Sequence, residues 1–233
     1  MSKVEVCLTP ELIHQFDLHD KLVVAVDIFR ATSCMVTGLG SGVQAIHPVL
    51  TIEECLHLGQ QGMITAGERG GKKIEEFDLG NSPFEYMQEH LKGRSIAVTT
   101  TNGTNTIKKS LAAKQVLIGS FLNLSATVDY ILSKKQDVIV HCAGWKGSVN
   151  LEDTLFAGAL IHRLDFQLHD DSSQLAHKLY LGNSANLLSV AQQSGHARRL
   201  AKFGITKDIA YCLQTDKFDI VCGLEGTGIK IVS

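Results

Sequence analysis

Two apolar runs near the N-terminus have the length and composition of buried β-strands. Residues 4–8 form the first, and the second, Leu22 to Val26, is continuously apolar and ends at the charged cluster Asp27-Ile28-Phe29-Arg30. A short continuous apolar run is typical of a strand that is covered on both faces of a parallel sheet. Residues 34–39 then predict a helix and residues 44–50 the next strand, which together make a β-α-β unit.

The same alternation continues along most of the chain. Strands are expected at residues 63–66, 95–100, 115–118 and 137–142, and helices at 52–60, 84–91, 106–113, 125–132 and 151–164. A polar loop is expected at 67–83, several short helices between 172 and 213, and a last strand at 228–232. Alternating strands and helices predict an α/β fold of three layers, α/β/α, with a mostly parallel sheet and a more helical C-terminal third. Because the composition shows no break, we expect one domain over residues 1–233.

The composition limits the kinds of binding partner that we expect for this chain. The net charge of the 233 residues is only -2 and no block of Lys or Arg is present, which argues against a nucleic-acid partner. No segment approaches the roughly 18 apolar residues of a membrane span, and the N-terminus lacks a signal-peptide core, so we expect no membrane partner and a cytoplasmic location. The six cysteines are scattered without a Cys-x-x-Cys pair, which predicts reduced and mostly buried thiols. The sequence leaves open whether the chain forms a homo-oligomer.

A first polar cluster follows the second strand directly. In open parallel sheets, ligands bind beyond the carboxyl ends of the strands, and Asp27, Arg30, Thr32 and Ser33 fall at such a position before a helix start. Arg30 could grip an oxyanion by paired hydrogen bonds, while Asp27 could hold Mg²⁺ or act as base or nucleophile. The structural alternative is an Asp27–Arg30 ion pair with Thr32 or Ser33 as the helix cap.

A second cluster follows the strand at 63–66. It contains Glu68, Arg69, two glycines and Lys72. The glycines let backbone N–H groups approach an anion, and the side chains supply both positive and negative charge. A charged, glycine-rich surface turn would have the same composition.

Two further polar turns are candidates for anion binding. Asn81 and Ser82 precede Pro83, and this triplet also suits an ordinary turn with proline at the first helical position. The strand at 95–100 ends in hydroxyls and leads into an Asn-Gly turn and a helix start, which can wrap an oxyanion with N–H and hydroxyl donors. The donors expected in that turn are Thr101, Asn102, Gly103 and Thr104.

Adjacent carboxylates open the helix expected at 151–164. Glu152 and Asp153 suit the positive end of a helix dipole, and the alternative is metal ligation. The ten histidines include no pair spaced for zinc, and His141 is interpreted as packing within a strand.

Familiar hydrolase motifs do not occur in the chain. No cysteine has an Arg six residues later, as a Cys-dependent phosphate loop requires, and Asp27 is not followed by a second Asp two positions on, as in haloacid-dehalogenase-type phosphatases. Residues 38–42 do not match the Gly-x-Ser-x-Gly elbow of serine hydrolases.

The four clusters in their order along the chain resemble the 2-phosphosulfolactate phosphatase family. The matching motifs are Val26 to Ser33, Gly67 to Lys72, Phe77 to Pro83 and Thr99 to Thr104, and the resemblance covers residues 3–160 well and the remainder loosely. It implies Mg²⁺-dependent hydrolysis of 2-phospho-3-sulfolactate to 3-sulfolactate and phosphate, a step towards coenzyme M, in a three-layer α/β fold.

On this resemblance, Mg²⁺ is held by Asp27 with Glu68 or with Glu152 and Asp153, and Arg30 and Arg69 neutralise charge on the phosphoryl oxygens. Two nucleophiles stay open: Asp27, which would form an aspartyl-phosphate, and a metal-bound water. Two other functions stay open as well, namely a phosphatase of the same fold for another small phosphorylated acid and a non-catalytic protein that binds small anions.

Overall fold

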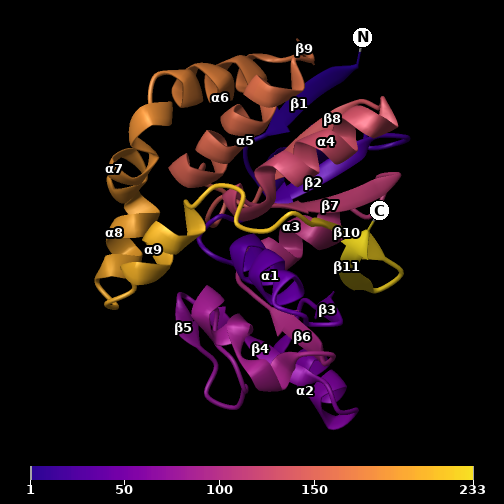
Figure 1. Ribbon diagram of the computed structural model, residues 1–233, viewed down its shortest axis with the longest axis vertical. Helices are drawn as coiled ribbons and strands as arrows, with labels where there is room; N and C mark the ends of the chain where they lie inside the picture. The colour runs from indigo at the N-terminus through magenta and orange to yellow at the C-terminus, as the bar shows by residue number, and fades with distance from the viewer. Residues whose placement is uncertain (1, 233) are drawn as a thin grey trace.

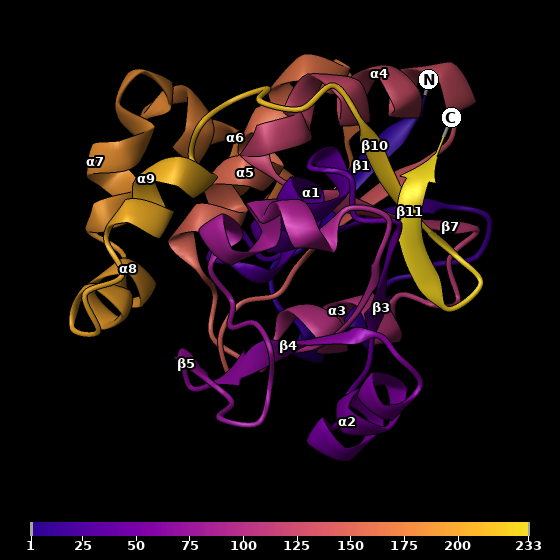
Figure 2. The ribbon, with the colours of Figure 1, turned by 60° about the horizontal axis from the view of Figure 1, so that its bottom comes forward.

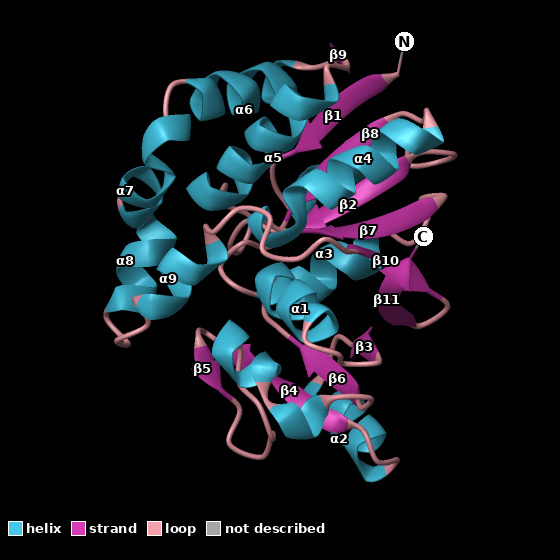
Figure 3. Cartoon of the chain, viewed as in Figure 1, coloured by secondary structure: helices cyan, strands magenta, loops and turns pink. Residues whose placement is uncertain are grey.

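Strands and helices alternate through the first two thirds of the chain (Figures 1 and 3), in a computed structural model that describes residues 2–232. The strands are β1 (Lys3–Cys7), β2 (Leu22–Val26), β3 (Ala45–Pro48), β4 (Ile64–Arg69), β5 (Lys72–Lys73), β6 (Ser95–Thr99), β7 (Gln115–Gly119), β8 (Val138–Cys142), β9 (Gln167–Leu168), β10 (Val221–Glu225) and β11 (Gly228–Val232). The α-helices are α1 (Ala31–Gly40), α2 (Ile52–Gln60), α3 (Gly103–Lys109), α4 (Leu124–Lys134), α5 (Leu151–Leu164), α6 (Asp171–Leu181), α7 (Leu187–Gln192), α8 (Gly195–Ala201) and α9 (Lys207–Cys212). Short 3-10 segments are η1 (Pro10–Gln15), η2 (Pro83–Met87), η3 (Glu89–Leu91), η4 (Phe121–Asn123) and η5 (Ser184–Asn186).

One sheet runs through the molecule, in the strand order β5-β4-β6-β3-β11-β10-β7-β2-β8-β1-β9. Strands β9, β1, β8, β2 and β7 pair in parallel on one side, and β3, β6 and β4 pair in parallel on the other. The α/β class and the mostly parallel sheet are therefore confirmed.

Several details of the predicted elements are wrong, including the loop expected at 67–83, which contains β5 and the end of β4. The antiparallel hairpin β10–β11 lies between the two parallel groups of strands, and only its second strand was expected. Its pairing is set by contacts with β7 and β3, which are distant in sequence, so local periodicity carries no sign of it. Residues 84–91, expected as one helix, form η2 and η3, because the backbone is extended at Gln88. Tyr86 of η2 is fully buried and lies against α1, where an added Cβ at Gly38 would come 3.1 Å from its ring.

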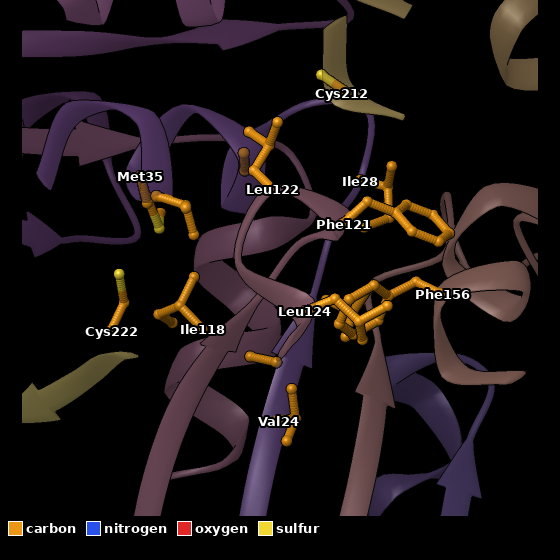
Figure 4. Close-up of a cluster of buried hydrophobic side chains, with 14 of the residues drawn as sticks. Val24, Ile28, Met35, Ile118, Phe121, Leu122, Leu124, Phe156, Cys212 and Cys222 are labelled. Atoms are coloured by element: carbon orange, nitrogen blue, oxygen red, sulfur yellow. The ribbon is translucent and has the colours of Figure 1, made fainter. Parts of the chain in front are cut away.

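Two neighbouring residues of β2 belong to different apolar clusters. Val24 of β2 belongs to the main apolar core, whereas its neighbour Val23 packs with Ile13 of η1 and Ile139 of β8. Adjacent side chains on a strand point to opposite faces, so the two clusters lie on the two sides of the sheet. In the main core, Phe121 and Phe156 pack edge to face with ring centroids 5.4 Å apart (Figure 4).

The helical C-terminal third forms an arc along one side of the sheet. Helices α6 to α9 follow one another in this arc, and α7, α8 and α9 stand together in both views (Figures 1 and 2). The arc is anchored where α5 and α6 touch, since a Cβ at Gly158 would lie 2.1 Å from the carbonyl oxygen of Ala176. Such a close approach of two helices requires glycine.

All six cysteines are free and buried, as expected. Among residues 2–232, no helix has both the length and the apolar character needed to cross a bilayer.

Candidate active site

A pocket lies where the segments after several strands meet the helical arc. Its walls come from β4 and from the segments that follow β2, β4, β6 and β8, together with helix α8. The lining residues are Asp27, Phe29, Arg30, Glu68, Gly70, Gly71, Asn81, Thr101, Asn102, Trp145, His196, Arg199 and Leu200. The structure thus brings members of all four predicted clusters into one pocket.

Asp27 lies at the base of this pocket, directly after β2. Its backbone N–H donates to Thr32 Oγ1 over 3.0 Å, which fixes the turn into α1. Burial raises the pKa of Asp27 to about 6, and the nearby Glu68 and Glu152 add to this effect while His196 opposes it. Gly103 leaves room for the carboxylate, because a Cβ there would lie 2.8 Å from Asp27 Oδ2.

Glu152 and Asp153, at the start of α5, are fully buried and do not line the pocket, but Glu152 contacts the lining residue His196. Both oxygens of Asp153 accept backbone N–H groups, from Ile28 over 2.9 Å and from Gly144 over 3.1 Å, so its side chain joins the segments after β2 and β8. Burial, with Glu152 and Asp27 as the next causes, raises the pKa of Asp153 well above its usual value. Glu152 Oε1 lies 2.6 Å from His196 Nδ1, which ties α5 to α8.

Glu68 organises the loop between β4 and β5. Its two carboxylate oxygens accept the N–H groups of Gly71 over 2.6 Å and Thr101 over 2.7 Å. The glycine-rich segment and the turn after β6 are therefore held together by one buried side chain. The surface-turn interpretation of this cluster does not apply to Glu68, which is 6% exposed and lines the pocket.

Whether these carboxylates suit Mg²⁺ can be judged from their free oxygen atoms. Glu152 Oε2 is buried without a hydrogen-bond partner, and Asp27 lines the pocket. Magnesium is often held by one or two protein carboxylates, with water and phosphate oxygens completing its shell. Within residues 2–232, no three His, Cys, Asp or Glu side chains form a complete metal cluster, so the chain offers only such a partial set. Asp27 and Glu152 fit this mode of binding, whereas Glu68 and Asp153 already accept backbone hydrogen bonds at each oxygen.

Arg30 is buried at the wall of the pocket with a partner from the helical third. Its Nη1 atom lies 2.5 Å from Asp208 Oδ2 of α9, and the two side chains are 6% and 10% exposed. The alternative ion pair with Asp27 is therefore wrong. The cap expected with it is wrong as well, because Arg30 itself is the N-cap of α1 and no side chain caps that helix.

Two of the predicted cations do not line the pocket. Arg69 donates to the carbonyl oxygens of Glu68 and Leu50 and to Thr99 Oγ1, so its guanidinium ties neighbouring backbone segments together. Lys72 is exposed, and its ammonium lies 5.5 Å from the centre of the Phe203 ring. Their catalytic and binding roles stay predictions.

The predicted hydroxyl donors serve mainly the local backbone. Thr32, Ser33 and Thr104 are buried and donate to the carbonyl oxygens of Asp27, Ile28 and Thr100 respectively. In contrast, Thr101, Asn102 and Asn81 line the pocket, and the Oδ1 atom of Asn81 is buried without a partner. Ser82 lines an adjoining cleft that shares Arg30, Gly71 and Asn81 with the pocket.

Four residues of this region were missed by the sequence analysis. Trp145 follows β8, a position that the strand-end argument could have singled out. His196, Arg199 and Asp208 come from α8 and α9, and no local pattern marks their side chains as facing the pocket.

Comparison with known proteins shows the family of the chain. Residues 7–227 match the protein family described as 2-phosphosulpholactate phosphatase. Three relatives are each named "Probable 2-phosphosulfolactate phosphatase". The protein from Caldanaerobacter subterraneus subsp. tengcongensis is 42% identical over 217 residues, covering 90% of each chain. The one from Thermotoga petrophila is 40% identical, covering 86% of this chain and 88% of its own, and the one from Clostridium beijerinckii is 35% identical, covering 94% and 95%. The chain therefore belongs to the 2-phosphosulfolactate phosphatase family of phosphoric monoester hydrolases.

Proposed function

We propose that this protein is a Mg²⁺-dependent phosphatase that hydrolyses 2-phospho-3-sulfolactate to 3-sulfolactate and phosphate. The observation that carries the proposal is the single pocket in which buried carboxylates and arginines from distant segments meet. The names of the relatives supply the substrate. A small acid with three anionic groups suits a pocket that presents both cations and metal-binding oxygens.

Each residue has a role that its surroundings support. Asp27 and Glu152 would hold Mg²⁺, which when bound would neutralise negative charge on the phosphoryl oxygens. Arg30 binds the phosphoryl group, and its guanidinium keeps one orientation because Asp208 holds Nη1. Helix α8 covers the pocket and limits the access of water to the buried carboxylates.

Asp27 is the group on which the chemistry depends. Its carboxylate serves either as the nucleophile that attacks phosphorus or as a ligand of the metal, and the ionised form is needed for both. The variant Asp27→Asn keeps the shape of the side chain but has no negative charge. We expect it to fold normally and to have no measurable turnover.

The test is phosphate release from 2-phosphosulfolactate, 2-phospholactate and phosphoglycerates, each measured with Mg²⁺ and with a chelator. Asp129→Asn is the matched control, because Asp129 is exposed on α4 and does not line the pocket. The proposal is supported if phosphate is released selectively from the sulfonated acid and only with Mg²⁺. This release should be lost in Asp27→Asn and kept in Asp129→Asn. Release only from the other acids would point to a different phosphorylated substrate, and binding without release would point to an anion receptor.

A further inference from the structure

Arg199 of α8 is a pocket residue to which no role has yet been assigned. Its side chain is half-buried, and its guanidinium carbon lies 3.9 Å from the centre of the Trp145 ring. Trp145 lies in the segment after β8, so the stacked pair bridges the sheet and the helical arc at the edge of the pocket.

The charges of the pocket leave Arg199 available to a ligand. Arg30 and Arg199 are the arginines that line the pocket, and Arg30 is already paired with Asp208. Within residues 2–232, Arg199 has neither an ion pair nor a side-chain hydrogen bond, and its guanidinium stacks on the Trp145 ring. The N–H groups along the edge of its guanidinium are therefore free to donate.

The environment of Arg199 suits the sulfonate of the substrate. Stacking on an indole covers the face of a guanidinium and leaves its planar fork of donors for an oxyanion. A sulfonate is ionised throughout the physiological pH range, spreads its charge over three oxygens and is a poor ligand for hard cations. The phosphoryl group, by contrast, is expected at the Asp27 and Arg30 side of the pocket.

We propose that Arg199, stacked on Trp145, binds the sulfonate of the substrate and sets the preference for sulfonated over plain phosphorylated acids. This inference rests on the proposed function for the identity of the substrate. It also gives the helical third a role, because α8 supplies the residue that binds the sulfonate.

A different role would be to offset the negative charge of the pocket. Burial lowers the pKa of Arg199, while Glu152 and Glu68 act in the opposite direction, so those carboxylates are near enough to interact with it. If charge balance were the whole role, removal of Arg199 would weaken activity on every substrate equally. Binding of the sulfonate predicts an effect that depends on the substrate.

The experiment compares Arg199→Gln with the parent protein on three substrates. They are 2-phosphosulfolactate, 2-phospholactate, which lacks the sulfonate, and 2-phosphonooxyethanesulfonate, which lacks the carboxylate. Arg198→Gln is the control, since Arg198 is the exposed neighbour on the same helix and donates to the carbonyl oxygen of Gln193.

We expect Arg199→Gln to lower kcat/KM by roughly 10- to 100-fold for the two sulfonated substrates, as for loss of a hydrogen bond to a charged group. Activity on 2-phospholactate and the activities of Arg198→Gln should stay near parental values. Arg199→Lys should recover part of the loss, because it keeps the charge without the planar fork. Equal losses on all three substrates, losses confined to those with a carboxylate, or no loss would overturn the inference.

A binding measurement separates this inference from the proposed function. Calorimetry with 3-sulfolactate and with lactate does not depend on turnover. If the parent releases no phosphate, the proposed function fails, but weaker binding of 3-sulfolactate by Arg199→Gln would still support the sulfonate site. Equal binding of 3-sulfolactate by the parent and by Arg199→Gln would overturn it.

Discussion

Asp208 is the partner that keeps the Arg30 charge paired inside the protein. The two side chains are 6% and 10% exposed, and Arg30 Nη1 lies 2.5 Å from Asp208 Oδ2. In Asp208→Asn the side chain keeps its size and one oxygen acceptor, but the guanidinium stays buried without a counter-charge. This single change therefore tests whether the helical third stabilises the Arg30 side of the pocket.

Removal of one partner from a buried ion pair costs about 3–5 kcal/mol. Because the asparagine oxygen can still accept a hydrogen bond, we expect the low end of this range, about 3 kcal/mol. A domain is typically stable by about 5–15 kcal/mol, so the variant should stay folded at room temperature with a clearly lower midpoint of unfolding.

The assay is urea unfolding, from which the midpoint and the slope give the free energy of unfolding. Glu225→Gln is the matched control, because its partner Lys230 is 4.0 Å away and both side chains are about half exposed, at 55% and 48%. An exposed pair contributes about 0–1 kcal/mol. The double variant Arg30→Gln with Asp208→Asn should be less destabilised than the sum of the single variants, since the unpaired charge is then gone. A loss below about 1 kcal/mol in Asp208→Asn, with an unchanged slope, would refute this reasoning.

Three further outcomes are expected. Gly103→Ala places a Cβ 2.5 Å from Ala31 Cβ and should lower phosphatase activity about 100-fold. The control Gly195→Ala adds a Cβ with no packing neighbour within 4 Å and should leave the activity unchanged. A fully active Gly103→Ala would contradict the tight packing at this position. Burial lowers the pKa of His141 from its usual 6.5 to about 3, so the unfolded chain takes up a proton that the folded chain does not. The contribution of His141 to the free energy of unfolding is then complete above pH 6.5 and decreases as the pH falls from 6.5 towards 3, by at most about 1.4 kcal/mol per pH unit. Urea unfolding at several pH values should show that the free energy of unfolding depends less on pH in His141→Gln than in the parent. Mg²⁺ should raise the Tm of the parent more than that of Glu152→Gln, and an equal rise in both would exclude Glu152 as a ligand.

Local patterns were sufficient to predict much of the framework of the pocket. An apolar run followed by Asp27, and another followed by the hydroxyl turn at 99–104, place polar groups at strand ends, because a strand buried on both faces can expose such groups only where it stops. The bounds of α5 were also predictable, since its apolar positions repeat with helical period.

The orientation of individual side chains could not be predicted in this way. Arg69 is the last residue of β4 and Arg30 lies shortly after β2, yet Arg69 binds neighbouring backbone and Arg30 lines the pocket. Likewise, Glu152 and Asp153 are adjacent, but only one of them has an oxygen without a hydrogen-bond partner. Spacing shows that a charge lies near a site, whereas its partners are decided by distant segments.

The sequence by itself determined the α/β class, the order of most elements and four polar clusters, because these depend on periodicity and on residues close together along the chain. Only the tertiary structure decided that β10 and β11 enter the middle of the sheet and that α8 and α9 bring Arg199, His196 and Asp208 to the pocket. Those arrangements depend on pairing and packing between segments that are distant in sequence, 44 residues apart for Glu152 and His196 and 178 for Arg30 and Asp208. Hydrophobic periodicity indicates that a face is buried but does not specify which surface covers it.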